Sequence, residues 1–156
     1  MKAMKHEGGN GQQARIQNAA LCYRITDEGK TEVLLITSRD TGRWVLPKGW
    51  PMAGKSPQAA AAREAFEEAG VEGEVSRHCL GFYSYNKLIA PKTGIPCVVA
   101  VYPLRVTGLS PKFPEKGQRR LKWFTPARAA ELVAEPELAA LLASFDARPA
   151  GTVPRP

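Results

Sequence analysis

The sequence predicts an α+β sandwich, in which a sheet is covered by helices. Several runs of alternating or β-branched apolar residues, each bounded by turn residues, are typical of strands. One alanine-rich segment between these runs has a high helix propensity, and two shorter helical segments follow the last strand. Strands on both sides of a central helix, followed by C-terminal helices, favour this layered class.

The composition is that of one ordinary globular domain. The chain has 156 residues, of which 44% are hydrophobic and 24% are charged. Its net charge of +7 favours a polyanionic partner, such as a polyphosphate, a nucleic acid or an anionic surface. The three cysteines match no zinc or redox spacing and fit the reducing cytoplasm, where we expect the protein to act. No apolar run approaches the length of a membrane span, so we expect no membrane partner.

The N-terminal part is predicted to contain three strands. Residues 1–14 are polar and glycine-rich, and we expect them to form a flexible arm. Strands are expected at residues 16–26, 33–37 and 43–46. The third strand stops at Pro47, and a loop rich in glycine and proline follows at residues 48–55.

The central helix has clear start and stop signals. Ser56 suits the N-cap, Pro57 suits the first helical position, and Gly70 suits the residue after the last turn. Several of its apolar residues recur at helical spacing and should face the core. They are Ala59, Ala62, Phe66 and Ala69.

The C-terminal part is predicted to add three strands and two helices. The strands are expected at residues 75–85, 96–106 and 119–124, with loops at residues 86–95 and 108–118. Thr125 and Pro126 start one helix, and Pro136 starts another that ends near residue 145. The proline-rich residues 146–156 are expected to be a disordered tail, which leaves residues 15–145 as the folded domain.

Three glutamates of the central helix should share one face. Glu64, Glu67 and Glu68 stand at positions i, i+3 and i+4, which are neighbours on a helix surface. Like charges this close repel each other unless a cation joins them. Grouped oxygen ligands suit Mg²⁺ or Mn²⁺. A solvated helix face is the alternative, which the spacing of the glutamates from Gly49 and Gly70 disfavours.

Residues 49–71 resemble the signature of the Nudix hydrolase superfamily, G-x5-E-x7-R-E-U-x-E-E-x-G-U, where U is a bulky apolar residue. The matching residues are Gly49, Arg63, Glu64, Glu67, Glu68, Gly70 and Val71. The resemblance implies an αβα sandwich with a mixed central sheet. It also implies an enzyme that uses divalent metal ions to hydrolyse a diphosphate linked to another group.

The resemblance implies a role for each polar residue of the signature. Glu64, Glu67 and Glu68 would bind the metal directly or through water, with help from the Gly49 carbonyl. One of the glutamates would act as the base, and the sequence leaves open which one. Arg63 lies four residues before Glu67 and would orient it through a charge-assisted hydrogen bond.

Lys55 departs from the signature, which has a glutamate at that position. A lysine cannot support Arg63 and would repel it at short range. We therefore expect Arg63 to bond to Glu67 alone and Lys55 to be a solvated loop residue. A movement of Lys55 toward a substrate phosphate is the alternative.

Other segments resemble the diphosphoinositol polyphosphate phosphohydrolases, which cleave diphosphoinositol polyphosphates and diadenosine polyphosphates. These segments are residues 19–24, 35–39, 42–47 and 117–124. In that subfamily, basic residues at strand ends hold the substrate. The candidates here are Arg15, Arg39, Arg43, Lys48, Arg119 and Arg120. Arg119 and Arg120 should point to opposite faces of a strand, so at most one should reach any one pocket.

Two other functions remain open from the sequence. Lys55 favours a non-hydrolytic regulatory module that binds nucleotides or polyphosphates, and the net charge favours an RNA 5′-end pyrophosphohydrolase. The basic residues are spread along the chain, which weakens a dedicated RNA-binding role. Trp50 could stack on a base, but packing in the core suits it better. The sequence is compatible with a monomer and with a homodimer.

Overall fold

The computed structural model describes residues 15–147, so the arm predicted at residues 1–14 and most of the tail predicted at 146–156 lie outside the described residues. The elements in chain order are β1 (Arg15–Ile25), β2 (Thr31–Thr37), β3 (Trp44–Val45), β4 (Lys48–Gly49), α1 (Pro57–Ala69), β5 (Val71–Val75), β6 (Gly81–Ala90), β7 (Thr93–Leu109), β8 (Leu121–Phe124), α2 (Pro126–Leu132) and α3 (Pro136–Ala143). Among the residues described, no helix has the length and apolar character needed to cross a membrane.

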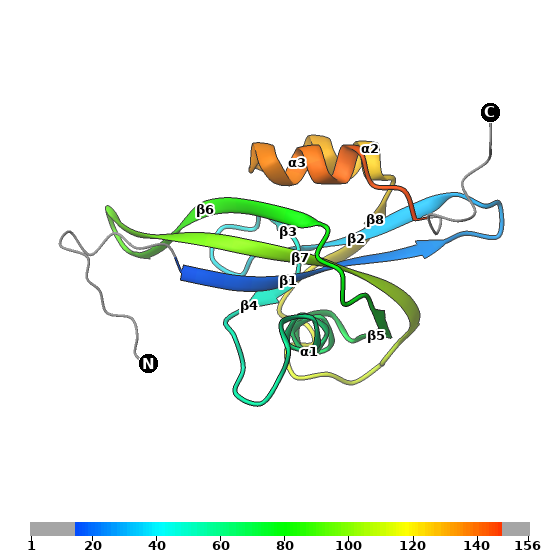
Figure 1. The fold of residues 1–156 in the computed structure, drawn as a ribbon, viewed down its shortest axis with the longest axis horizontal. Coiled ribbons are helices and arrows are strands. Elements are labelled where there is room, and N and C mark those ends of the chain that lie inside the picture. Colours follow the sequence, from blue (N-terminus) through cyan, green and yellow to red (C-terminus); the bar gives the residue numbers. More distant parts are fainter. Residues whose placement is uncertain (1–14, 148–156) are drawn as a thin grey trace.

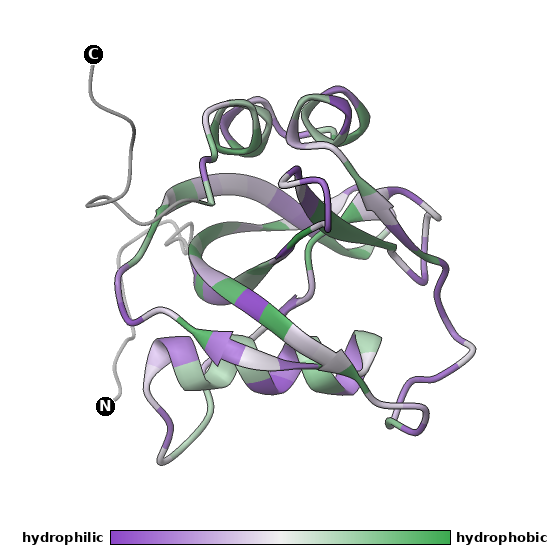
Figure 2. Ribbon diagram, turned by 90° about the vertical axis from the view of Figure 1, so that its right-hand side faces the viewer, coloured by the Kyte–Doolittle hydropathy of each residue, from purple (hydrophilic) through white to green (hydrophobic). Residues whose placement is uncertain are grey.

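The elements form three layers. Helix α1 covers one face of the sheet, and α2 and α3 lie side by side on the other face (Figures 1 and 2). The sheet has eight strands with the central order β3-β2-β1-β7-β5, and β4, β6 and β8 pair with β1, β7 and β2. β1 and β7 run parallel, whereas the other pairings are antiparallel. The predicted α+β sandwich with a mixed sheet is confirmed.

The apolar core is divided between the two faces of the sheet. In β1, Ala19 and Leu21 belong to the cluster under α2 and α3, whereas Ala20 and Cys22 belong to the cluster under α1. This division follows from the two-residue period of a strand. Because both faces are covered, the central strands are continuous apolar runs.

Helix α1 begins and ends where the sequence predicts. The Ser56 hydroxyl accepts a hydrogen bond from the Ala59 N–H at 3.2 Å, and Gly70 ends the helix with a φ of 71°. The predicted core face is largely wrong, because Ala59, Ala62 and Phe66 are only half-buried. The buried alanines are Ala60, Ala61, Ala65 and Ala69. Alanines four residues apart let the helix lie close to the sheet, and the larger Phe66 is displaced to the side.

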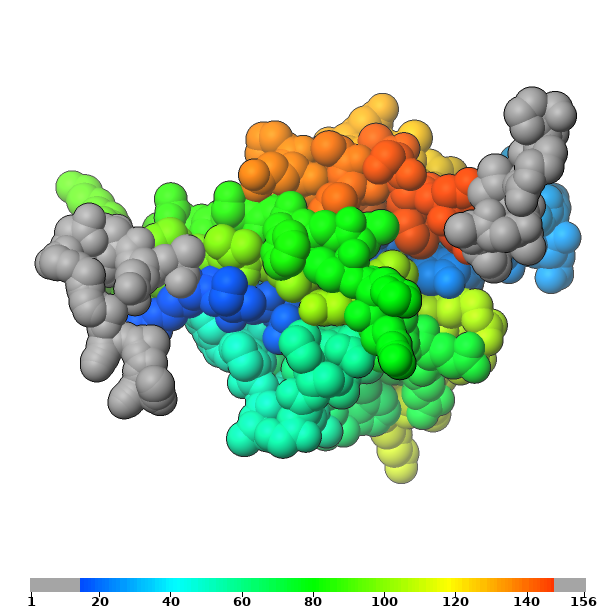
Figure 3. Space-filling view, viewed as in Figure 1, coloured from blue at the N-terminus to red at the C-terminus, as the bar shows by residue number. Residues whose placement is uncertain are grey.

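The strand predicted at residues 75–85 and the loop predicted at 86–95 are wrong. β5 and β6 are separate strands, and β6 starts at Gly81 and continues through the predicted loop to Ala90. Lys92, with a φ of 66°, lies in the turn to β7, and this hairpin extends past α2 and α3 (Figure 3). Within the described sheet β6 pairs with β7 alone, so it can carry polar residues that hide the alternation of a strand.

Candidate active site

A cavity of about 280 Å³ lies where α1, β4 and the loop between β7 and β8 meet. Its walls combine carboxylates and cations that come from segments far apart in the chain. The predicted site residues that line it are Arg39, Lys48, Gly49, Glu64, Glu68 and Arg119. The charged lining residues that the sequence did not indicate are Asp40, Lys87 and Glu115.

Glu64 and Glu68 lie one turn apart on α1 and meet at the cavity wall. Glu68 is only 7% exposed. Burial, together with a hydrogen bond that the protonated Glu68 donates to the Glu64 carboxylate, raises the pKa of Glu68 to about 8. Burial raises the pKa of Glu64 as well. The pair therefore retains a shared proton near neutral pH, and a divalent cation is the natural replacement for that proton.

Strand β4 brings the backbone against this carboxyl pair. Gly49 is paired with Asn18 of β1, which fixes it beside the helix. A Cβ atom at Gly49 would overlap the Glu64 carboxylate, so only glycine lets the backbone approach this closely. The Lys48 N–H donates to Glu68 Oε1 at 3.3 Å. The loop predicted at residues 48–55 thus starts with a two-residue strand that lies against Glu64 and donates to Glu68.

Glu67 is not among the residues that line the cavity. Its Oε2 accepts a hydrogen bond from Nε of Arg63 at 2.7 Å, which is the predicted contact. The predicted convergence of three glutamates therefore extends in this structure to Glu64 and Glu68, while Arg63 draws Glu67 to the outer side of the helix. Lys55 is exposed and does not line the cavity, as expected for a solvated loop residue.

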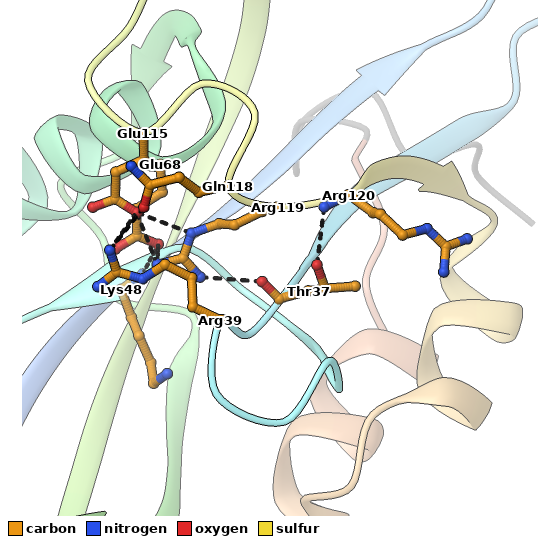
Figure 4. Close-up of polar contacts among 8 residues, drawn as sticks. All are labelled: Thr37, Arg39, Lys48, Glu68, Glu115, Gln118, Arg119 and Arg120. Carbon is orange, nitrogen blue, oxygen red and sulfur yellow. Dashed lines mark hydrogen bonds and ion pairs between the residues drawn. The ribbon is translucent and has the colours of Figure 1, made fainter.

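Two arginines and a loop glutamate line the cavity beside Glu68 and contact one another (Figure 4). Glu115 Oε1 lies 2.9 Å from Nη2 of Arg119 and 3.9 Å from Nη1 of Arg39. Arg119 Nη1 also donates to the Thr37 carbonyl at 3.1 Å, and Arg119 Nη2 lies 4.0 Å from Glu68 Oε1. The Arg119 side chain is only 10% exposed, so these contacts hold its guanidinium group in one place.

Glu115 is the missed lining residue that contacts both arginines of the cavity. It lies in an irregular loop without a motif or a period, and the sequence offers only its position four residues before Arg119. The loop is attached to the end of α1, because the Glu115 N–H donates to the Glu67 carbonyl at 2.9 Å. The Ser110 N–H donates to the Gly70 carbonyl at 2.8 Å. The helix that carries the carboxylates therefore also positions the loop that faces them.

The remaining predicted residues lie farther from the carboxyl pair. Arg43 lines a second cavity, of about 400 Å³, beside the first. Arg120 points away from Arg119, and its guanidinium carbon lies 5.2 Å from the centroid of the Trp44 ring (Figure 4). The geometry therefore does not bring Arg120 to either cavity, and both arginines precede β8, which begins at Leu121 and not at the predicted residue 119. Trp50 lines the first cavity and is 38% exposed, so the prediction that it packs in the core is wrong.

The donor set of the cavity fits a hard divalent cation with few protein ligands. Within residues 15–147, no group of three or more histidine, cysteine or acidic side chains is arranged to hold a metal ion. Two carboxyl groups, those of Glu64 and Glu68, do share a hydrogen bond at the wall, and Gly49 keeps the backbone against them. Mg²⁺ is commonly bound by one or two carboxylates and keeps several of its waters.

The fold and the cavity define a class of protein, an αβα sandwich whose single helix on one face carries a carboxylate pocket. The family model described as the NUDIX domain matches residues 15–145. The chain therefore belongs to the NUDIX family, which confirms the resemblance seen in residues 49–71.

The chain is similar to curated proteins of this family. It is 37% identical over 109 residues to human diphosphoinositol polyphosphate phosphohydrolase 3-alpha, covering 68% of this chain and 61% of that protein. It is 34% identical over 106 residues to Nudix hydrolase 12, mitochondrial, of Arabidopsis thaliana, covering 66% of this chain and 52% of that protein. The chain thus spans about three fifths or less of the length of these relatives.

Solved structures show the same fold. The Ap4A hydrolase of C. elegans superposes with a TM-score of 0.59 at 22% identity, covering 84% of this chain and 95% of that chain. The NUDIX domain of Shewanella oneidensis NrtR superposes with a TM-score of 0.61 at 16% identity, covering 87% of this chain and 90% of that chain. At these identities the likeness establishes the arrangement of helices and strands.

Proposed function

We propose that this chain is a pyrophosphohydrolase that uses Mg²⁺ or Mn²⁺ to hydrolyse a diphosphate bond in a highly charged small molecule. The observation that carries the proposal is the cavity in which Glu64 and Glu68 face Arg39 and Arg119. The name of the human relative supports a substrate of the diphosphoinositol polyphosphate type. Residues 35–39 and 117–124 resemble that subfamily, so diadenosine polyphosphates are a second candidate class of substrate.

The carboxylate wall is the proposed metal site. Glu64, Glu68 and the Gly49 carbonyl would hold the cation, and Glu67 would support them from the outer side, oriented by Arg63. When bound, the cation neutralises charge on the diphosphate and lowers the pKa of a coordinated water. In the metal-free protein the buried Glu68, whose pKa lies near 8, holds a proton near neutral pH, and a bound cation would displace it.

The cationic wall binds and orients the phosphate groups. Arg119 is already fixed by Glu115 and Thr37, so substrate binding needs little reorganisation of its guanidinium group. Arg39 is half exposed and can adjust to the substrate. Burial lowers the pKa of Lys48, and the charge of Glu68 partly offsets this shift.

The test is a panel of diphosphate compounds incubated with Mg²⁺ or Mn²⁺, with products identified by mass spectrometry in ¹⁸O water. We expect cleavage of polyphosphate substrates and a loss of about 100-fold or more in Glu68→Gln, because a lost metal ligand removes several kcal/mol of charge stabilisation. Glu74→Gln is the matched control, since Glu74 is exposed and pairs with Arg105 away from the cavity. A folded, metal-loaded protein that is inert on the whole panel would refute the proposal, and binding without turnover would favour the regulatory module.

A further inference from the structure

A second cavity, of about 400 Å³, adjoins the proposed active site. Lys48 and Lys87 line both cavities, so the two lie side by side. The second cavity is lined by three cations, Arg43, Lys48 and Lys87, and by one carboxylate, Asp40. A cleft in which one sign of charge prevails concentrates ligands of the opposite sign. It holds none of the α1 carboxylates, so a ligand there would be bound rather than cleaved.

Lys48 connects the two cavities. Its backbone N–H donates to Glu68 Oε1 on the side of the carboxylates. Its side chain leads away from Glu68 (Figure 4), and its Nζ lies 5.0 Å from the centroid of the Tyr85 ring in the wall of the second cavity. A polyanion longer than one diphosphate can therefore contact Lys48 while it extends from one cavity into the other.

Arg43 is the cation that lines the second cavity and not the first. Its Nε donates to the Thr41 hydroxyl at 3.3 Å, and its Nη1 donates to Glu135 Oε2 at 3.4 Å. The Arg43 side chain is still 45% exposed, whereas the Glu135 side chain is 9% exposed. The buried carboxylate thus holds one edge of the guanidinium group and leaves the rest accessible to a ligand.

Stability of helix α3 does not explain why Glu135 is buried. Glu135 occupies the N-cap position of α3, but its side chain caps no backbone N–H of the helix. Its Oε1 is buried and has no hydrogen-bond partner within residues 15–147. A buried carboxylate oxygen without a partner is unfavourable for folding. Folding alone therefore disfavours Glu135 at this position. Its negative charge has a use as the counterion of Arg43.

We propose that the second cavity binds the distal, phosphate-bearing end of the substrate, and that Glu135 is the positioning residue that holds Arg43 ready to receive it. The inference rests on the proposed function, since it places the cleaved diphosphate in the first cavity. A phosphate suits this cavity better than an uncharged group, because three cations converge there and one is fixed by a buried carboxylate.

The test measures binding of inorganic triphosphate to the metal-free protein by calorimetry, so that it needs no hydrolysis. Arg43→Gln should weaken binding about tenfold, the size expected for one charge-assisted contact. Glu135→Gln should weaken it several-fold although it makes the protein more positive, and the double variant should bind no more weakly than Arg43→Gln. Such non-additivity is the mark of a residue that acts through another.

Arg24 and Glu32 provide the matched controls. They form a similar ion pair, with Arg24 Nη2 2.7 Å from Glu32 Oε1, and neither lines a cavity described above. Arg24→Gln and Glu32→Gln change the net charge by the same amounts as the test variants. The inference is overturned if Glu135→Gln binds triphosphate as tightly as Glu32→Gln, or if Arg43→Gln binds it as tightly as Arg24→Gln.

A second readout separates this inference from the proposed function. With a long polyphosphate substrate, Glu135→Gln should raise KM with kcat unchanged, and with a short diphosphate substrate it should change neither. If the protein cleaves no diphosphate compound but its variants bind triphosphate as expected, only the proposed hydrolase activity is refuted. An active protein in which Glu135→Gln leaves both KM and binding unchanged would refute the second subsite alone.

Discussion

Raising the pH should destabilise the metal-free protein because of Glu68. Its pKa rises from 4.5 to about 8 on folding, chiefly through burial. Between these two values the folded protein retains a proton that the unfolded chain has released, so a higher pH favours unfolding. Each pH unit in this window costs about 1.4 kcal/mol, and the whole window costs on the order of 5 kcal/mol.

The assay is urea denaturation with a chelator at several pH values from 5 to 8, for wild type and Glu68→Gln. Glutamine does not titrate, so the difference between the two proteins reports the proton that Glu68 shares with Glu64. We expect the stability of wild type to fall relative to the variant by roughly 1 kcal/mol per pH unit. Saturating Mg²⁺ should remove most of this slope, because a cation that displaces the proton stabilises the charged form.

Two results would refute this reasoning. A stability difference that stays constant from pH 5 to 8 would mean that Glu68 has an ordinary pKa in the folded protein. A slope that persists unchanged in saturating Mg²⁺ would mean that the proton and the cation do not compete, and that the carboxyl pair is not the metal site.

Three further predictions concern single residues. Gly49→Ala should displace the Glu64 carboxylate and weaken Mg²⁺ binding at least tenfold by calorimetry, with little loss of stability because a flexible side chain can move. Ser56→Ala should lower the free energy of unfolding by about 1 kcal/mol, seen by urea denaturation, through loss of the α1 cap with the active site intact. Arg119→Gln should reduce kcat/KM for a polyphosphate by at least tenfold while Arg120→Gln changes it less than twofold, and equal losses would contradict the assignment.

The sequence predicts well the elements that have local signals. Helix α1 is fixed by Ser56 and Gly70, whose preferences are set by a few neighbouring atoms, and both act as expected. The central strands are buried on both faces and show as apolar runs. The prediction of strand β6 fails because, within the described sheet, β6 pairs with β7 alone. Such a strand needs no apolar alternation, so the sequence of β6 resembles that of a loop.

The site residues also divide into those with a local sequence signal and those without one. Glu64, Glu68 and Gly49 belong to one contiguous motif, and helical geometry alone predicts that two of them meet. The direction of the Glu67 side chain depends on its hydrogen bond to Arg63. Helical spacing predicts that Arg63 and Glu67 can pair, but it does not predict that Glu67 bonds to Arg63 and stays away from the cavity. Glu115 is brought in by a loop whose contacts with α1 are entirely tertiary, so no local pattern reveals it.

The contacts of Glu115 and Glu135 narrow the class of polyanion that the net charge suggests. Each is an acid outside every sequence motif, and each contacts an arginine that lines a cavity, Arg119 in one case and Arg43 in the other. A charge of +7 by itself suits any polyanion, including RNA. Arginines fixed by acids in two adjoining cavities favour instead a compact polyphosphate of matching length, because the fixed geometry selects the positions of its phosphates as well as their charge.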